Sequence, residues 1–132
     1  MTGTVERVIV AAAIVDGGKL LVQQRAYPDE AAGLWELPGG RVEDGETEHD
    51  ALRRECSEEL DVEVTVGVRI GDDVVLWGGS LLRVYAAALV GGGVPRAVEH
   101  KALRWVGADE VAGVDWLPAD RGLVPDLEEL LA

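Results

Sequence analysis

The first part of the chain alternates between apolar runs and turn residues. Residues 5–15 are rich in Val, Ile and Ala, and residues 19–25 form a second apolar run after Asp16-Gly17-Gly18. An acidic residue followed by glycines is typical of a tight turn between antiparallel strands. The pattern therefore predicts a β-hairpin. Residues 26–33, which contain Pro, acidic residues and Ala, are expected to form a loop at the rim of a pocket.

An amphipathic helix is predicted from Thr47 onward. Asp50, three positions after Thr47, resembles the partner in a capping box. Apolar residues then recur at helical spacing, and the buried face they predict consists of Ala51, Leu52, Cys56 and Leu60. Glu55, Glu58 and Glu59 flank this face. Because residues three and four apart are neighbours on a helix, these carboxylates form one acidic stripe.

The remainder of the chain predicts further strands and a last helix. Residues 62–70 alternate polar and apolar side chains, residues 74–77, 81–90 and 102–106 are rich in strand formers, and three glycines at 91–93 interrupt them. These are signals of antiparallel ribbons. Residues 108–111 predict one short helical turn, and residues 125–130 predict a helix that begins with Pro. From spacing alone, the expected fold class is α+β.

Length and composition predict a single domain over residues 1–132. This length supports one hydrophobic core and is too short for two. Hydrophobic residues make up 48% of the chain and charged residues 28%, which excludes disorder, and no apolar run approaches the roughly 18 residues of a membrane span. The N-terminus lacks the pattern of a signal peptide. With one cysteine no internal disulfide can form, so the cytoplasm is the expected location.

The balance of charge limits the class of partner. The chain has 12 basic and 25 acidic residues, which gives a formal net charge of −13. Such a surface repels the phosphates of DNA and RNA, so no nucleic-acid polymer is expected to bind. Metal ions can supply positive charge locally and admit a small anion. The expected partner is therefore a small-molecule nucleotide.

The acidic stripe predicts a divalent metal ion. Like charges at neighbouring helix positions each cost about 0.2–0.5 kcal/mol, and a hard cation with carboxylate ligands would offset that cost. A solvated acidic face is the usual alternative. Here, however, an apolar segment and the loop Pro38-Gly39-Gly40 precede the helix, and such a loop lets the backbone approach a ligand closely. We therefore expect Mg²⁺, with Mn²⁺ as a substitute. Residues 43–46 do not have the alternating ligands of an EF-hand, which excludes a Ca²⁺ module of that kind.

The segment from residue 40 to residue 62 resembles the Nudix box, G-x5-E-x7-R-E-U-x-E-E-x-G-U, where U is a bulky aliphatic residue. The matching positions are Gly40, Glu46, Arg54, Glu55, Glu58, Glu59 and Val62. Two positions depart from the pattern. Cys56 replaces an aliphatic residue, which is a mild change because a buried thiol behaves as a small hydrophobe. Asp61 replaces a glycine, and because Asp tolerates the left-handed backbone better than most residues, we expect a slightly strained helix end and intact activity.

The resemblance to MutT-like Nudix proteins extends over residues 8–127 and implies an α/β/α sandwich with a mixed β-sheet. It also implies Mg²⁺-dependent hydrolysis of a nucleoside triphosphate to a nucleoside monophosphate and pyrophosphate. The implied metal ligands are Glu55, Glu58, Glu59, Glu99 and the carbonyl of Gly39. The implied catalytic residues are Glu55, Arg54, Glu58 and Glu99, with Glu55 as the first candidate for the general base and Arg54 holding its carboxylate. The implied substrate-binding residues are Arg25, Glu36, His100 and Asp120.

Asp120 is the residue expected to select the nucleobase. MutT-like proteins present a base-reading side chain near this position, and an ionised carboxylate can only accept hydrogen bonds. The exocyclic amine of cytosine suits an acceptor, whereas oxidised guanine also needs a donor to its O6. The whole chain also resembles the CTP/dCTP pyrophosphohydrolases of this family. Cytosine nucleotides, including 5-methyl and 5-hydroxy forms, are therefore expected, with sanitation of the nucleotide pool as the role. The alternative for Asp120 is the N-cap of the last helix.

Two other functions stay open. The first is the same fold acting on 8-oxo-dGTP. The second is a nucleotide sensor that binds without hydrolysis, against which the intact Glu55, Glu58 and Glu59 argue. The sequence also leaves open the oligomeric state, monomer or homodimer, the number of metal ions, the preferred sugar and which glutamate is the general base.

Overall fold

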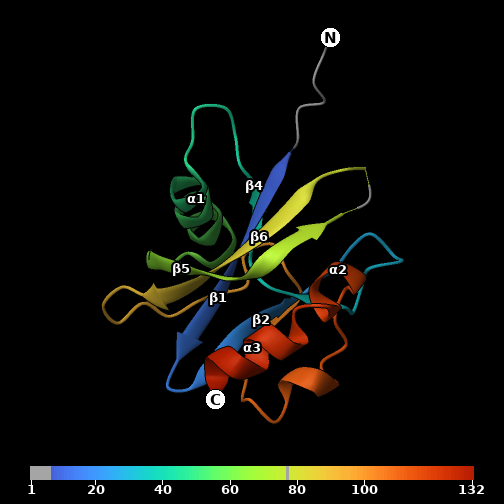
Figure 1. The fold of residues 1–132 in the computed structure, drawn as a ribbon. Coiled ribbons are helices and arrows are strands. Elements are labelled where there is room, and N and C mark those ends of the chain that lie inside the picture. The colour runs from blue at the N-terminus through green and yellow to red at the C-terminus, as the bar shows by residue number, and fades with distance from the viewer. Residues whose placement is uncertain (1–6, 77) are drawn as a thin grey trace.

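The computed structural model describes residues 7–76 and 78–132, and its centre is a seven-stranded mixed sheet (Figure 1). The strands are β1 (Val8–Asp16), β2 (Lys19–Gln24), β3 (Trp35–Glu36), β4 (Gly39–Arg41), β5 (Val64–Val75), β6 (Leu81–Leu89) and β7 (Ala102–Val106). The helical segments are α1 (Glu48–Leu60), η1 (Val111–Gly113), α2 (Pro118–Arg121) and α3 (Val124–Leu131). Residues 5, 6 and 77, which the sequence assigned to strands, lie outside the described residues. Within the described ranges, no helix is long and apolar enough to cross a membrane.

Strand β1 organises the sheet because it pairs with three other strands. The strand order is β3-β2-β1-β6-β5, while β4 pairs with β1 and β7 pairs with β2. The predicted hairpin of β1 and β2 is present, with Asp16 opposite Lys19. The expected antiparallel pairing holds for β5 with β6 and for β2 with β7. In contrast, β1 runs parallel to β6, which requires a long crossover, and the chain between these strands includes helix α1.

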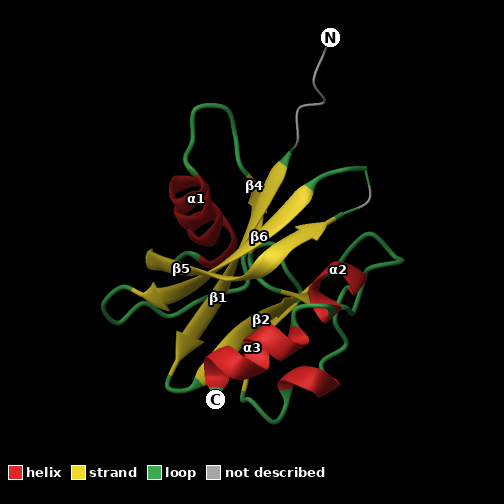
Figure 2. Ribbon diagram, in the orientation of Figure 1, coloured by secondary structure: helices red, strands yellow, loops and turns green. Residues whose placement is uncertain are grey.

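Alternate residues of β1 face two different cores. Val10, Ala12 and Ile14 pack with the buried face of α1, whereas Ala11 and Ala13 pack on the other side with residues of η1 and α3. This alternation follows from the two-residue period of a strand. Helix α1 therefore covers one face of the sheet and α3 the other, as Figure 2 shows. The predicted α/β/α sandwich with a mixed sheet is confirmed.

Helix α1 begins and ends as its sequence predicts. The Thr47 side-chain oxygen accepts a hydrogen bond from the backbone N–H of Asp50 at 3.1 Å. Ala51, Leu52, Cys56 and Leu60 are fully buried. Asp61 follows the helix in the left-handed conformation, with φ 56° and ψ 42°, and its N–H bonds to the carbonyl of Ser57. Glu59 is also buried, so the acidic stripe reaches into the protein instead of only flanking its apolar face.

Other segments differ from the sequence prediction. The two strands expected at 62–70 and 74–77 form one long strand, β5, whose irregularities fall between Val66 and Arg69 and between Ile70 and Val74. Gly39 and Gly40 lie in β4 instead of a loop, since this short strand pairs with β1. The helical turn expected at 108–111 is displaced to η1, and α2 was not predicted. The last helix, expected at 125–130, is present as α3.

Replacing Asp61 by Gly should raise the free energy of unfolding by up to about 1 kcal/mol. Glycine adopts the left-handed backbone without the steric cost of a Cβ, although its larger entropy in the unfolded chain offsets part of this gain. Urea unfolding measured by circular dichroism tests this expectation. Asp61→Ala is the control and should be less stable than Asp61→Gly, since both variants lose the same exposed ion pair with Arg96. Equal stability of the two variants would contradict strain at this position.

Candidate active site

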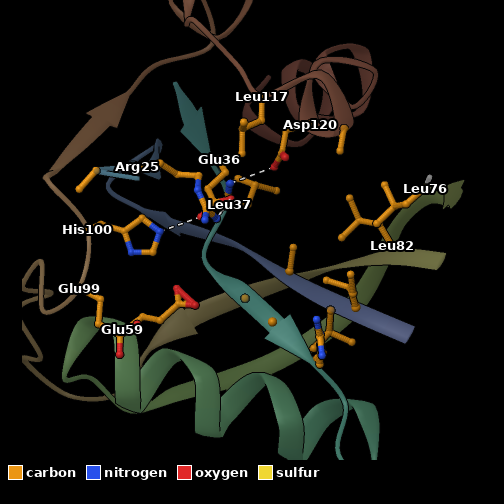
Figure 3. Close-up of a pocket in the computed structure, with 18 of the residues that line it drawn as sticks. Arg25, Glu36, Leu37, Glu59, Leu76, Leu82, Glu99, His100, Leu117 and Asp120 are labelled. Carbon is orange, nitrogen blue, oxygen red and sulfur yellow. Dashed lines mark hydrogen bonds and ion pairs between the residues drawn. The ribbon is translucent and has the colours of Figure 1, made fainter. Parts of the chain in front are cut away.

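A cavity of about 390 Å³ opens between the sheet, the segment around His100 and helix α2 (Figure 3). One end is apolar and is lined by Leu37, Leu76, Leu82 and Leu117 together with Asp120. The other end is lined by polar side chains: Arg25, Glu36, Glu59, Glu99 and His100. The chain has no Phe, and aliphatic side chains provide most of the apolar wall.

Glu36 connects two residues that the sequence identified separately. Its Oε1 accepts a hydrogen bond from Arg25 Nη1 at 3.4 Å, and its Oε2 lies 2.7 Å from His100 Nε2. Glu36 lies in strand β3, Arg25 directly follows β2, and His100 lies in the segment before β7. Arg25 and His100 are thus held at the cavity wall through one carboxylate. The predicted substrate-binding residues Arg25, Glu36 and His100 lie together.

Glu59 is the buried acid of the cavity. Its side chain projects from α1 toward β2, where Gln23 Nε2 donates a hydrogen bond to Glu59 Oε2 at 2.7 Å. Burial raises the pKa of Glu59 to about 8, the hydrogen bond from Gln23 opposes this shift, and the carboxylates of Glu55 and Glu36 add to it. At neutral pH a proton or a cation must therefore accompany this group.

Gln23 is a residue that sequence reasoning missed. It is fully buried in β2 and donates to both Glu59 and, at 3.4 Å, Glu36. The available signal was an amide that directly follows the apolar run Leu20, Leu21 and Val22 in a strand. A buried polar side chain costs free energy unless it is hydrogen-bonded, so such a position indicates a polar partner.

Arg54 forms the hydrogen bond to Glu55 that the sequence predicted. Its Nη1 lies 2.9 Å from Glu55 Oε1 and 3.3 Å from Glu58 Oε1, while Nε and Nη2 contact both oxygens of Glu46 at 2.8 and 2.9 Å. The same guanidinium lowers the pKa of Glu46 to about 2, chiefly through hydrogen bonding. One arginine thus donates hydrogen bonds to three carboxylates and limits their mutual repulsion.

Gly39 and Gly40 allow the backbone to approach other groups more closely than a Cβ would permit. A Cβ at Gly40 would lie 2.4 Å from Glu55 Cδ, and one at Gly39 would lie 1.9 Å from the carbonyl oxygen of Val10. The carboxylate of Glu55 therefore lies directly against β4. Its pKa is raised, mainly by burial, while Arg54 opposes the shift. Any larger residue at position 40 would displace Glu55.

The predicted ligands Glu55, Glu58, Glu59 and Glu99 have the chemistry that a divalent cation requires, although their side chains do not converge on one point. Among the described residues, no three Asp, Glu, His or Cys side chains lie close enough together to hold a metal ion. Glu58 is about half exposed and faces Arg54, Glu59 faces Gln23, and Glu99 lies exposed at the cavity rim. The donors are hard oxygen atoms with excess negative charge, which suits Mg²⁺ or Mn²⁺. The close contact of the Glu55 carboxylate with Gly40 and the burial of Glu59 support the binding of such a cation.

Asp120 does not open the last helix. It is the third residue of the short helix α2, and Leu123 is the residue before α3. Its side chain is 6% exposed, and Oδ2 accepts a hydrogen bond from the backbone N–H of Leu37 at 3.0 Å. The N-cap interpretation is therefore wrong, because the carboxyl is directed to the cavity wall. Burial raises the pKa of Asp120 to about 7, so both its acid and its ionised form are accessible near neutral pH.

The model of the NUDIX domain matches residues 5–127. The chain belongs to the Nudix family. This Nudix protein is 54% identical over 128 residues to a Mycobacterium tuberculosis H37Rv protein named "Putative 8-oxo-dGTP diphosphatase 2", covering 95% of this chain and 90% of the relative. It is 38% identical over 125 residues to the CTP pyrophosphohydrolase of Escherichia coli K12, covering 94% and 90%.

Solved structures agree with this assignment. The solution structure of the Escherichia coli ORF135 protein superimposes with a TM-score of 0.80 at 36% identity, over 96% of this chain and 91% of that one. The predicted family and fold are confirmed, and so is the prediction of an enzyme, a Nudix pyrophosphohydrolase. The roles of individual residues in this Nudix protein stay predictions.

Replacing Asp120 by Asn should stabilise this Nudix protein increasingly as the pH rises from about 4 to about 7. The folded chain binds the Asp120 proton more tightly than the unfolded chain does, since the pKa rises from 3.8 to about 7, and ionisation therefore destabilises the fold across this window. Urea unfolding at pH 5 and pH 8 should show a relative gain of about 1–3 kcal/mol. The exposed Asp115→Asn is the control and should show no such trend. A pH-independent difference for Asp120→Asn would refute the raised pKa.

Proposed function

We propose that this Nudix enzyme hydrolyses nucleoside triphosphates to nucleoside monophosphate and pyrophosphate in the presence of Mg²⁺, with cytosine nucleotides as preferred substrates. One observation carries the proposal: a single cavity joins an apolar end, where the buried Asp120 can meet a base, to an acidic end formed by Glu59 and Glu99. A base and a phosphate chain need these two environments side by side. The proposed role is sanitation of the nucleotide pool, which places the enzyme in the cytoplasm.

The acidic end is proposed to hold the metal. The ligands would be Glu55, Glu58, Glu59 and the carbonyl of Gly39, with Glu99 at the rim. When bound, Mg²⁺ supplies positive charge to the phosphates and lowers the pKa of a coordinated water. Arg54 holds the Glu55 carboxylate at 2.9 Å and so fixes the proposed general base. Arg25, one third exposed at the cavity wall, is placed to contact phosphate oxygens.

Asp120 is proposed to read the base with its free oxygen. Oδ2 is engaged by the N–H of Leu37, which leaves Oδ1 for a ligand. An ionised Oδ1 accepts from the exocyclic amine of cytosine, N4. The 38% identity to an enzyme named CTP pyrophosphohydrolase, over nearly the whole chain, supports the same base. Modified cytosines with a small group at C5, such as 5-methyl and 5-hydroxy forms, are included in the proposal.

A second candidate substrate is 8-oxo-dGTP. A relative with 54% identity is named for that activity, and the pKa of Asp120, raised to about 7 by burial, makes the acid form available. The acid form donates a hydrogen bond and could therefore pair with O6 of the oxidised guanine, which the ionised form repels. The protonation state of one side chain thus separates the two candidates.

Replacing Glu58 by Gln should preserve the fold and lower kcat by several powers of ten, because the exchange removes one ligand charge at nearly constant shape. Pyrophosphate release from dCTP with excess Mg²⁺ measures the effect. Glu129→Gln, an exposed exchange on α3, is the matched control and should leave the rate unchanged. Near-normal turnover of the Glu58 variant would remove it from the proposed ligand set.

A substrate panel tests the base assignment. Pyrophosphate release from dCTP, CTP, 5-methyl-dCTP and 8-oxo-dGTP should be fastest for the cytosine nucleotides at pH 8, where Asp120 is ionised. The ratio of 8-oxo-dGTP to dCTP hydrolysis should rise as the pH falls below 7, since the donor form of Asp120 then accumulates. The Asp120→Asn variant retains a donor but has no free acceptor, so its ratio of 8-oxo-dGTP to dCTP hydrolysis should be high at every pH.

Three results would count against this proposal. An unchanged preference in the Asp120 variant would remove this residue from base reading. A higher kcat/KM for 8-oxo-dGTP at pH 8 would make oxidised guanine the preferred base. Binding of nucleotide with no pyrophosphate release from any triphosphate would indicate a sensor instead of an enzyme acting on these substrates.

A further inference from the structure

Gln23 is a polar side chain in the interior of the sandwich. It lies in β2 next to the buried Leu21 and Val22, and none of its surface is exposed. An amide in such surroundings costs free energy unless its hydrogen bonds are made. Its partners come from two other elements, Glu36 in β3 and Glu59 in α1. The contacts of this amide therefore explain its presence in the core.

The orientation of the amide follows from its neighbours. Nε2 lies 2.7 Å from Glu59 Oε2 and 3.4 Å from Glu36 Oε2, and both neighbours are carboxylate oxygens. An amide oxygen facing the two ionised carboxylates would repel both, and with a cation bound to Glu59 the nitrogen therefore lies on this side. The other atom, Gln23 Oε1, is buried and has no hydrogen-bond partner within the described part of the chain.

We infer that Gln23 is a positioning residue for the metal site: its amide holds the Glu59 carboxylate in the orientation that binds the divalent cation. This inference rests on the proposed function, in which Glu59 is a metal ligand. The hydrogen bond restricts the rotamers of a buried glutamate and engages its Oε2. Residues that orient metal ligands in this way raise metal affinity without touching the ion.

A neutral donor is suited to this task. An Arg or Lys at position 23 would cancel the charge of Glu59 and compete with the cation, as Arg54 does for Glu46 by engaging both of its oxygens. An Asn has the same amide but is one methylene shorter, so it cannot span the same distance. Gln supplies the donor without adding positive charge and reaches the carboxylate at 2.7 Å.

The test compares Gln23→Met with Gln24→Met by their affinity for Mn²⁺ in the absence of nucleotide, measured by electron paramagnetic resonance. Met preserves the length and volume of the side chain but has no N–H donor. Gln24, the next residue in β2, directs its amide to the carbonyl of Gly33 and does not line the cavity, so its exchange is a matched control. We expect Gln23→Met to bind Mn²⁺ about 10- to 100-fold more weakly than the parent chain. Gln24→Met should stay within about threefold of the parent, within the context-dependent scatter of such effects.

Turnover gives a second, independent measurement. With dCTP, the Mg²⁺ concentration for half-maximal activity should rise for Gln23→Met by a factor similar to the loss of Mn²⁺ affinity, while the KM for the nucleotide at saturating Mg²⁺ changes little. Gln23→Asn should show the same shift, and it serves in place of the Met variant if thermal unfolding shows that Met is not tolerated. Mn²⁺ affinity within threefold of the parent in a folded Gln23 variant would overturn the inference. A parent chain that neither binds Mn²⁺ nor releases pyrophosphate would instead overturn the proposed function, and the inference with it.

Discussion

One constraint governs this structure: several glutamate carboxylates lie close to one another at the cavity. Glu36 comes from β3 and Glu55 from α1, and both carboxylates raise the pKa of Glu59, which is almost fully buried. In water such a cluster would disperse, but the helix and the sheet prevent this. The fold therefore has to supply counter-charges and donors at defined positions, and the contacts around the cavity can be understood as the way it does so.

Each carboxylate has a different kind of partner. Arg54 engages Glu46 with two nitrogens and reaches Glu55 and Glu58 with the third, so full positive charge lies on the outer side of α1. Arg25 and His100 bind Glu36 at the wall of the cavity. On the inner side, Glu59 accepts hydrogen bonds from neutral donors, the amide of Gln23 at 2.7 Å and the backbone of Gly39. Positive charge therefore decreases from the outer side of the helix toward the inner side, and the excess negative charge is left where a cation would enter.

Local patterns were sufficient to predict the helix that carries the acids. Its first turn at Thr47, its buried face and the left-handed Asp61 depend on residues close together in sequence, so periodicity and capping rules apply directly. The spacing of Arg54 and Glu55 also fixed their hydrogen bond, because neighbouring groups on one helix turn have little freedom. The same continuity made the family recognisable from residues 40 to 62.

Contacts between distant segments could not be predicted in this way. Gln23 and Glu59 are 36 positions apart, and Glu36 and His100 are 64 apart, so only the folded sheet brings them together. The sequence indicates Asp120 as a base-contacting residue, with the N-cap of the last helix as the alternative. An additional short helix, α2, excludes the cap, because Asp120 is the third residue of that helix. The parallel pairing of β1 with β6 likewise depends on the path of the chain around α1, and an apolar strand pattern does not encode that path.

The close contact between β4 and β1 determines which parts of the cavity tolerate amino-acid substitutions. Gly39 lies so near the Val10 carbonyl that no side chain fits, which joins the acidic end of the cavity to the central strand of the sheet. Asp120, in contrast, belongs to a four-residue helix at the periphery. With Asp120 reading the base as proposed, substitutions in that helix would change which base is accepted and leave the contacts around Glu59 intact. Specificity could then evolve separately from hydrolysis.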